Sequence, residues 1–275
     1  MPEAPELQVA KEFLQRVLPG QTIVGTRIIK PTVLRPLAST DISSDIVGRH
    51  FEGVQRKGKS LILDISGGRL LAVFPMLAGA LQYCGPKERL FKTACFVLSL
   101  SSGNELRYLD ERQMGMAYYL SLEQTTEVRR MEDGGPDVLD EMPPSEQFAP
   151  LLRKHRGEIK GILTRGRLVA GIGNAYADEV LFRAGIFPFK KVRTLKPEEV
   201  HLLYDALRDV PQEAVAILRK RMGDQIHIKI RDFMQVHGKG GLSCPKCGGR
   251  ISSITANQRI TNFCRHCQPG LLVHN

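Results

Sequence analysis

Two closely spaced cysteine pairs constrain the fold of this chain more than any other feature of its sequence. Two residues separate Cys244 from Cys247, two separate Cys264 from Cys267, and sixteen residues lie between the pairs. Two Cys-x2-Cys knuckles at this spacing are typical of one tetrahedral zinc ion held by four thiolates, with a two-stranded hairpin between them. Because four thiolates leave no open coordination position, we expect one structural Zn2+. A redox pair or an iron–sulfur cluster is the alternative, which this spacing suits less well.

The charge balance indicates a polyanionic partner. The formal net charge is +10 at pH 7, and the pI is about 9.4. A basic protein of this size most often meets nucleic acid, although a basic but otherwise ordinary enzyme is the alternative. Near the cysteine pairs, Arg250, Arg259 and Arg265 suit contact with phosphates, or else they form a solvated basic face. Since tryptophan is absent and aromatic residues make up 6% of the chain, a surface of stacked aromatics for single strands is not expected.

The N-terminal residues and the hydropathy pattern argue against a secreted or membrane protein. No apolar run approaches the ~18 residues that a membrane span requires. The first residues, MPEAPELQVAKEF, contain acids and lack an apolar core of signal-peptide length. We therefore expect a reducing, cytoplasmic location, in which paired cysteines favour metal binding over a disulfide.

The N-terminal half has the pattern of a β-rich domain behind one helix. Apolar residues recur at helical spacing over 4–18, and Pro19 and Gly20 then stop the helix. From residue 22 to 120 the period changes to short runs rich in Val, Ile and Leu, separated by turn signals. The segments predicted as strands include 21–29, 60–65, 69–74, 94–100 and 105–109. Because no long helix interrupts them, we expect an antiparallel sandwich or barrel with a leading helix.

The C-terminal half has a helical pattern that follows a linker. Residues 132–145 hold two glycines, three prolines and five acids, a composition that disfavours regular structure. The segments predicted as helices are 146–154, 158–164, 175–184, 197–209 and 211–221. The sequence thus predicts a β-rich domain over 1–131, a linker over 132–145, a helical domain over 146–237 and a metal ribbon over 238–270.

The first three residues suggest a chemistry of their own. Methionine before a small residue is commonly removed, and Pro2 would then present a secondary amine, which attacks carbon when unprotonated. The carboxyl group of Glu3 beside it suits acid/base work on a sugar oxygen. Many chains begin Met-Pro by chance, so these residues alone carry little weight.

Five segments of the chain have the form of known motifs. They are MPEAPE at 1–6, RKGK at 56–59, RYLDER at 107–112, GIGNAYA at 171–177 and QRIT at 258–261 before the second cysteine pair. Together they resemble the formamidopyrimidine-DNA glycosylase/endonuclease VIII family. They span nearly the whole chain in the order of the family's motifs, and chance agreement of all five is very improbable.

The resemblance implies both a fold and an activity. The fold is an α+β multidomain one, with an N-terminal antiparallel β-sandwich behind a leading helix, a helix–two-turn–helix DNA-binding domain and a β-hairpin zinc ribbon. The activity is that of a bifunctional DNA glycosylase/AP lyase in base excision repair, which excises oxidised bases and nicks the strand by β,δ-elimination. The implied partner is double-stranded DNA with damaged bases or abasic sites. A monomer, nucleoid-associated and with no membrane contact, is expected.

The resemblance also assigns roles to single residues. Those implied for catalysis are Pro2 as Schiff-base nucleophile, Glu3 as proton donor to the ribose, Lys59 in β-elimination and Arg259 in δ-elimination. Those implied for DNA binding are Asn174 on phosphate and Arg112 opposite the orphaned base. The alternatives are a solvated turn lysine for Lys59, a turn or N-cap role for Asn174, and ion pairs of Arg112 with Asp110 or Glu111.

The chain departs from the family pattern at the residues that would fill the void left by an extruded base. Leu77 stands where the family usually has methionine, and Met114 stands where it usually has phenylalanine. Leu77 and Met114 both remain apolar wedges. Met76 is an alternative wedge, and Leu77 and Met114 could instead belong to the core. Gln8 replaces a frequent acid or arginine, without touching the expected chemistry directly.

A second departure concerns the lesion. The segment 222–243 is short and lacks the long loop with which family members cap 8-oxoguanine. Oxidised pyrimidines, ring-opened purines and abasic sites are therefore the expected substrates. A non-catalytic damaged-DNA-binding member of the family is the alternative function, and a zinc-ribbon nucleic-acid adaptor is a more distant one.

Overall fold

The computed structural model describes residues 1–39, 41–132, 134–256 and 259–270. The chain forms two compact units, Met1–Asp133 with Val215–Ile230 and Gly134–Ala214 with Arg231–Asn275. Residues 215–230 therefore group with the N-terminal strands, whereas the sequence pattern placed them in the helical domain. The reason is tertiary contact, because the Arg219 guanidinium pairs with the Glu12 carboxylate at 2.6 Å and the His227 ring lies 6.0 Å from that of Phe91.

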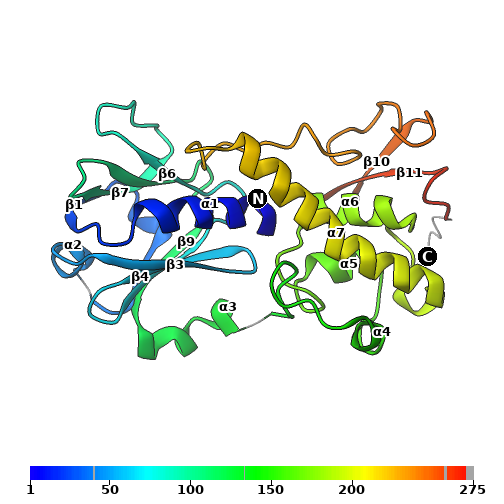
Figure 1. Ribbon diagram of the computed structural model, residues 1–275, viewed down its shortest axis with the longest axis horizontal. Coiled ribbons are helices and arrows are strands. Elements are labelled where there is room, and N and C mark those ends of the chain that lie inside the picture. Colours follow the sequence, from blue (N-terminus) through cyan, green and yellow to red (C-terminus); the bar gives the residue numbers. More distant parts are fainter. Residues whose placement is uncertain (40, 133, 257–258, 271–275) are drawn as a thin grey trace. The chain divides into compact units, whose positions relative to one another are not determined.

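Two β-sheets and a leading helix, α1 (Ala4–Val17), build the N-terminal unit (Figure 1). One sheet has the order β1 (Ile23–Ile28), β7 (Ala94–Leu100), β8 (Glu105–Leu109), β6 (Ala80–Cys84). The other has the order β2 (Leu34–Pro36), β9 (Met116–Ser121), β5 (Arg69–Phe74), β4 (Ser60–Ile65), β3 (Phe51–Lys57). All neighbouring strands pair antiparallel except β2 and β9. The predicted sandwich is confirmed, and four of its strands, β4, β5, β7 and β8, have the bounds expected from the sequence.

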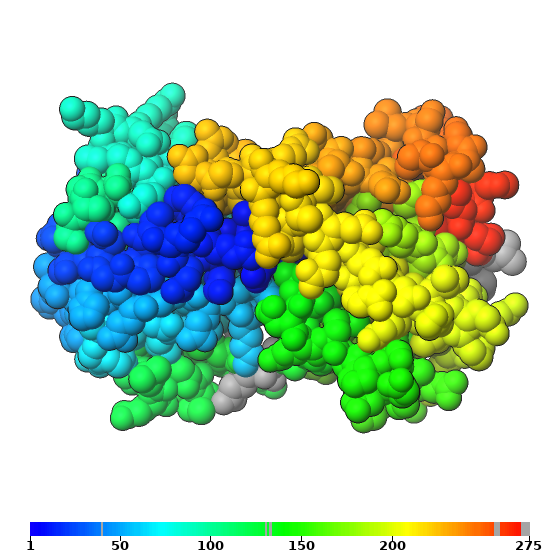
Figure 2. Space-filling view, in the orientation of Figure 1, coloured from blue at the N-terminus to red at the C-terminus, as the bar shows by residue number. Residues whose placement is uncertain are grey.

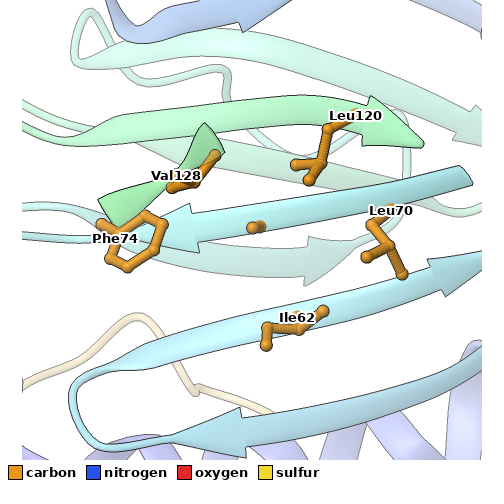
Figure 3. Packing of buried hydrophobic residues seen from close by; sticks show 6 residues of the cluster. Ile62, Leu70, Phe74, Leu120 and Val128 are labelled. Atoms are coloured by element: carbon orange, nitrogen blue, oxygen red, sulfur yellow. The ribbon is translucent and has the colours of Figure 1, made fainter. Parts of the chain in front are cut away.

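Strand β5 buries both of its faces, which explains its unbroken apolar sequence. Leu71 points into the sandwich, where it meets Phe96 and Leu98 of the other sheet. Leu70 and Phe74 point to the opposite side (Figure 3), into a cluster with Ile62, Leu120 and Val128. This cluster lies beneath the helical turns η2 (Leu122–Glu127) and α3 (Arg129–Glu132). Alternate residues therefore serve two cores, as the period of two along a strand requires.

Helix α1 packs against β3 and β4 through its apolar stripe, and Figure 2 shows its residues in dark blue beside the lighter blue strands. Leu7, Ala10 and Leu14 are buried along this face at helical spacing. The Gln15 side chain accepts the backbone N–H of Val54 at 2.6 Å, which fixes the register of the helix on the sheet. The sheet thereby sets the position of the first residues of the chain.

The C-terminal unit holds short helices and a β-hairpin. Its elements are α4 (Ser145–Arg153), α5 (Ile159–Thr164), α6 (Asn174–Ala184), η3 (Val192–Thr194) and the strands β10 (Ile251–Ala256) and β11 (Arg259–Cys264). Gly185 ends α6 at φ 69°, a backbone conformation that glycine adopts without strain. The hairpin joins the two cysteine pairs, as the spacing predicts.

Helix α7 (Pro197–Arg221) runs unbroken where the sequence pattern suggested two helices. Pro211 lies inside it rather than at the start of a second helix. Leu207, Pro211, Ala214 and Leu218 are all buried, so the apolar stripe continues through the proline. Burial along this stripe outweighs the ~3 kcal/mol that an internal proline costs. None of the described helices is both long and apolar enough to cross a membrane.

Candidate functional site

Pro2 lies at the wall of a cavity of about 90 Å3 in the N-terminal unit. The start of α1, the turn after β5 and the segment 226–229 line this cavity. The lining residues are Met1, Pro2, Glu6, Leu77, Ala78, Gly79, Ala80, Ile226, His227, Ile228 and Lys229. With Met1 attached, the Pro2 nitrogen is an amide. Because Met1 lines the same cavity, its removal would free the amine and also vacate space beside it.

Two buried glutamates, Glu3 and Glu6, interact at the start of α1, directly after Pro2. Glu3 is 1% exposed and occupies the N-cap of α1. Its backbone N–H donates to Oε2 of Glu6 at 3.0 Å, which satisfies an amide that a helix start leaves unpaired. Glu6 itself is 5% exposed. Sequence reasoning overlooked Glu6, although a glutamate at the third helical position is a recognised capping signal.

Lys59 sits in the tight turn between β3 and β4. Gly58, at φ 55°, allows this turn. The Arg56 guanidinium spans the turn, since it donates to Oε1 of Gln8 at 2.8 Å and to the Gly58 carbonyl at 3.0 Å. Gln8 belongs to α1, so this bridge ties the Lys59 turn to the helix that carries Glu3. Gln8 therefore contacts the turn of Lys59 indirectly, through Arg56, which its position in the sequence alone did not indicate.

Leu77 and Met114 are solvent-exposed at the tips of two turns of this unit. Their exposed fractions are 45% and 49%, so the alternative that they belong to the core is wrong. The side chain of Arg112 is also exposed, and its backbone N–H donates to Oδ1 of Asp110 at 3.0 Å. Within the described part of the chain its guanidinium forms no ion pair with Asp110 or Glu111, so that alternative is wrong as well.

Asn174 and Arg259 meet in a second cavity, of about 450 Å3, within the C-terminal unit. Asn174 is the first residue of α6 and Gly173 is its N-cap, so the expected N-cap alternative for Asn174 is wrong. Its Nδ2 donates instead to the Ile260 carbonyl of β11 at 2.8 Å. Arg259 donates to the Thr164 hydroxyl at 3.1 Å. The remaining lining residues are Glu158, Lys160, Gly161, Arg165, Phe189 and Thr261.

The chemistry of this second cavity suits an anion. Three cationic side chains, those of Lys160, Arg165 and Arg259, line it. The N-terminal turn of α6 adds backbone N–H groups and the positive end of a helix dipole. A phosphate of a nucleic acid backbone is the anion that such a combination most often binds.

Lys160 is a site residue that sequence reasoning missed. It is 7% exposed, and it donates to the Ile260 carbonyl at 3.1 Å and to the Thr261 hydroxyl at 2.8 Å. Its ammonium also lies 2.6 Å from Oδ1 of Asp178, which is 0% exposed. A lysine inside the otherwise apolar run of α5 was the signal that could have revealed it, because buried lysines need a partner.

The four cysteines of the ribbon converge as the spacing predicts. Their Sγ atoms all lie within 4.8 Å of one another, with Cys244 and Cys267 at 3.8 Å and Cys247 and Cys264 at 3.5 Å. Sulfurs bound at ~2.3 Å around one tetrahedral zinc ion would be separated by just under 4 Å, so the cluster fits the metal.

The four thiols lie close enough to influence one another's pKa values. Burial and the thiols of Cys247 and Cys244 raise the pKa of Cys267 to about 12. Burial acts in the same direction on Cys244, but the backbone N–H groups of Cys247 and Lys246 lower its pKa to about 7. Four thiolates this close repel one another, and a divalent cation removes that repulsion.

Comparisons with known proteins agree with this geometry. Residues 1–117 match the formamidopyrimidine-DNA glycosylase N-terminal domain, 135–225 match its H2TH domain, and 241–270 match the zinc finger found in FPG and IleRS. The formamidopyrimidine-DNA glycosylase of Pelotomaculum thermopropionicum is 32% identical over 98% of this chain and 99% of its own length. That of Listeria monocytogenes is 31% identical over 98% of this chain and 100% of its own length.

Solved structures give the same result. Lactococcus lactis Fpg, in a complex with abasic-site-containing DNA, superposes with a TM-score of 0.87 at 28% identity, covering 98% of this chain and 100% of that one. The same protein with Fapy-dG-containing DNA gives equal values.

These matches define the class of the protein, which is a β-sandwich protein with a helix–two-turn–helix domain and a C-terminal zinc finger. The chain belongs to the formamidopyrimidine-DNA glycosylase/endonuclease VIII family. The resemblance read from the five sequence motifs is thereby confirmed, and so is the predicted α+β multidomain fold.

Proposed function

We propose that this protein is a bifunctional DNA glycosylase/AP lyase of base excision repair. The observation that carries the proposal is the shared cavity of Pro2 and Leu77. It brings the expected nucleophile and the expected wedge to one place in the fold, with the N-cap carboxyl of Glu3 next in the chain. The named activity of the relatives, formamidopyrimidine-DNA glycosylase, supports the same reaction class.

The proposed reaction starts once Met1 has been removed. The lone pair of the Pro2 nitrogen attacks C1′ of the damaged nucleotide, the N–C1′ bond forms and the N-glycosidic bond breaks. The electron pair of the broken bond leaves with the base, and the base takes up the proton that the Pro2 nitrogen loses. Glu3 delivers a proton to O4′, so the sugar ring opens and an iminium joins Pro2 to C1′.

Strand cleavage follows from the iminium as electron sink. Loss of a C2′ proton expels the 3′ phosphate in β-elimination, for which we assign Lys59. Loss of a C4′ proton then expels the 5′ phosphate in δ-elimination, for which we assign Arg259. Asn174 and the N-terminal turn of α6 hold the backbone phosphate, so the damaged nucleotide can be extruded from the stack. Arg112 faces the base left behind.

The segment 226–229 provides the polar groups that contact an extruded base. It replaces a long capping loop with a short stretch whose polar groups are those of His227 and Lys229. Burial lowers the pKa of His227, against the opposing effect of Glu88 and Asp224, so its ring is neutral at pH 7. A neutral imidazole both donates and accepts hydrogen bonds. We propose oxidised pyrimidines, ring-opened purines and abasic sites as substrates, with 8-oxoguanine disfavoured.

Residues 1–131, together with the segment 215–230 that groups with them, form the catalytic domain. Residues 132–145 form the linker, 146–214 and 231–237 the helix–two-turn–helix DNA-binding domain, and 238–270 the zinc finger. One zinc ion, held by the four cysteines, is structural. The protein acts as a monomer on double-stranded DNA, in the cytoplasm and associated with the nucleoid.

Borohydride trapping tests the proposal. The purified protein is mixed with duplex DNA that carries one abasic site, borohydride is added, and a denaturing gel is read for a covalent adduct. We expect an adduct with wild type and none with Pro2→Ala, which should still bind the DNA. If a protein of confirmed zinc content that has lost Met1 gives no adduct, the proposal fails and the non-catalytic DNA-binding alternative replaces it.

A further inference from the structure

Two turns of the N-terminal unit share one design. In each turn a non-glycine residue with positive φ directly precedes an exposed apolar residue. Met76, at φ 49°, precedes Leu77, and Gln113, at φ 51°, precedes Met114. Among the described residues these two are the only non-glycines with positive φ. Such conformations cost free energy and persist where surrounding contacts enforce them, which occurs most often at functional sites.

Both turns close against the hydroxyl group of Tyr108. Gly79 ends the first turn and Gly115 ends the second, and a Cβ atom added at either position would overlap the Tyr108 hydroxyl oxygen. Tyr108 lies on β8, is 0% exposed, and stacks on the Phe96 ring at 5.4 Å. One rigid side chain thus fills the space between the backbones of two turns that are 36 positions apart in the chain (Gly79 to Gly115).

The second turn has an anchor of its own in the same place. The buried carboxylate of Asp110 accepts the backbone N–H of Arg112 at 3.0 Å and that of Gly115 at 2.7 Å. The Thr32 hydroxyl donates to the Gln113 side chain at 2.8 Å from outside. The turn that presents Arg112 and Met114 is therefore held at both ends, and its inner end is the glycine that touches Tyr108.

The Tyr108 hydroxyl lies between the two turns and close to the Asp110 carboxylate. Within the described residues it is buried without a hydrogen-bond partner. Burial, and to a lesser extent the nearby Asp110 carboxylate, raises the pKa of Tyr108, so the hydroxyl stays neutral. Burying an unpaired hydroxyl is unfavourable compared with burying the ring edge of phenylalanine. Its close approach to both glycines gives the oxygen a structural role in the two turns.

We propose that Tyr108 is a positioning residue that couples the two turns, so that Leu77 and Met114 enter the DNA duplex together. The inference rests on the proposed function, in which both residues act as wedges. The oxygen sets the separation of the two turns. Without it each turn gains room to move, and the two wedges fill the void left by an extruded base less often at the same time.

The test uses Tyr108→Phe in the full-length protein and a fluorescence signal that needs no chemistry. The DNA carries one abasic site with 2-aminopurine as the opposite base, whose fluorescence rises when the wedge unstacks it. We expect the rate of this rise, and of borohydride trapping, to fall about tenfold. A second DNA, in which the same nucleotides are already unpaired in a bulge, should be trapped at the wild-type rate. The thermal midpoint should stay unchanged or rise.

A matched control and a second variant sharpen the test. Tyr83→Phe removes a hydroxyl that pairs with Asn104 at 3.0 Å on β6, and it should leave both rates unchanged. Gly115→Ala should slow the fluorescence rise, because its Cβ overlaps the oxygen.

Several results would overturn the inference. Equal losses on the paired and the bulged DNA would mean a general structural effect, and no loss on the paired DNA would mean no coupling. Failure of the proposed function is a separate outcome, since wild type would then give no trapped adduct while the fluorescence rise remained measurable.

Discussion

The ammonium of Lys160 lies 2.6 Å from the carboxylate of Asp178, and both side chains are almost fully buried. Asp178 also faces Nδ1 of His237 at 2.8 Å and accepts the backbone N–H of Asn262 at 3.2 Å. One carboxylate on α6 therefore holds α5, the segment before the ribbon, and β11. Because Lys160 also lines the cavity of Asn174 and Arg259, this pair links the stability of the C-terminal unit to the cavity that we propose to hold a backbone phosphate.

Replacing Lys160 with methionine should destabilise the protein strongly. The Asp178 carboxylate would remain buried without its main counter-charge, which costs about 3 kcal/mol. The midpoint of urea unfolding should fall accordingly, and DNA affinity should fall with it. The exposed Lys154→Met is the matched control and should change stability little. The double change Lys160→Met with Asp178→Asn should recover part of the loss, and a double variant no more stable than Lys160→Met would refute the ion-pair explanation.

Asp45 makes the N-terminal unit sensitive to acid. Despite the cost of its burial, the Tyr119 hydroxyl and the guanidinium groups of Arg49 and Arg69 lower the pKa of Asp45 from 3.8 to about 2. A carboxyl with a lowered folded-state pKa stabilises the protein above its unfolded-state value, and this contribution is lost as the pH falls through about 2. By linkage the contribution is about 2 kcal/mol at neutral pH.

Asp45→Asn should therefore be less stable than wild type at pH 6 by about 2 kcal/mol, and the difference should vanish near pH 2. Urea unfolding at a series of pH values measures this difference. Tyr119→Phe removes the 2.5 Å hydrogen bond to Oδ2 and should reproduce part of the effect. A difference between Asp45→Asn and wild type that is constant over this range would show that Asp45 acts through packing and not through its charge.

The sequence predicted what local patterns determine and missed what distant contacts determine. The ribbon followed from the spacing of Cys247 and Cys264, and β4 from an apolar run between turn signals. Helix α7 was split at Pro211 because the burial that outweighs a proline is a tertiary effect. Lys160 and Tyr108 were missed for the same reason. The role of Lys160 depends on Asp178, and that of Tyr108 on Gly79 and Gly115, and these partners are distant in the chain or belong to another element.

Loss of zinc should disable the hairpin while sparing the N-terminal unit. Cys264→Ser removes one of four ligands, and the folding free energy of a small metal ribbon comes largely from the metal. We expect loss of bound zinc and at least about tenfold weaker DNA binding, because Arg259 and the Asn174 partner Ile260 lie on β11. Cys84→Ser, which changes a buried thiol of β6, should keep its zinc. Normal DNA binding by zinc-free Cys264→Ser would show that the ribbon is not part of the DNA interface.

The bridge from Gln8 through Arg56 should matter more for strand cleavage than for base release. Gln8→Leu removes the Gln8 acceptor of the Arg56 guanidinium and leaves its hydrogen bond to the Gly58 carbonyl in place. The turn that carries Lys59 then loses one of its links to α1, at a cost in stability of about 1 kcal/mol. Because Lys59 is assigned to β-elimination and Pro2 to the attack on C1′, the elimination step should slow several-fold relative to formation of the trapped adduct.

Single-turnover assays on abasic DNA separate the two steps, with borohydride trapping for the iminium and strand cleavage for elimination. Gln55→Leu is the matched control, because Gln55 lies on the same strand as Arg56 and pairs outward with Asp64 at 2.9 Å. It should leave both rates unchanged. If Gln8→Leu slows trapping and cleavage by the same factor, the bridge supports α1 and Pro2 rather than Lys59. If neither rate changes, the bridge is structural only, and Gln8 has no part in either step.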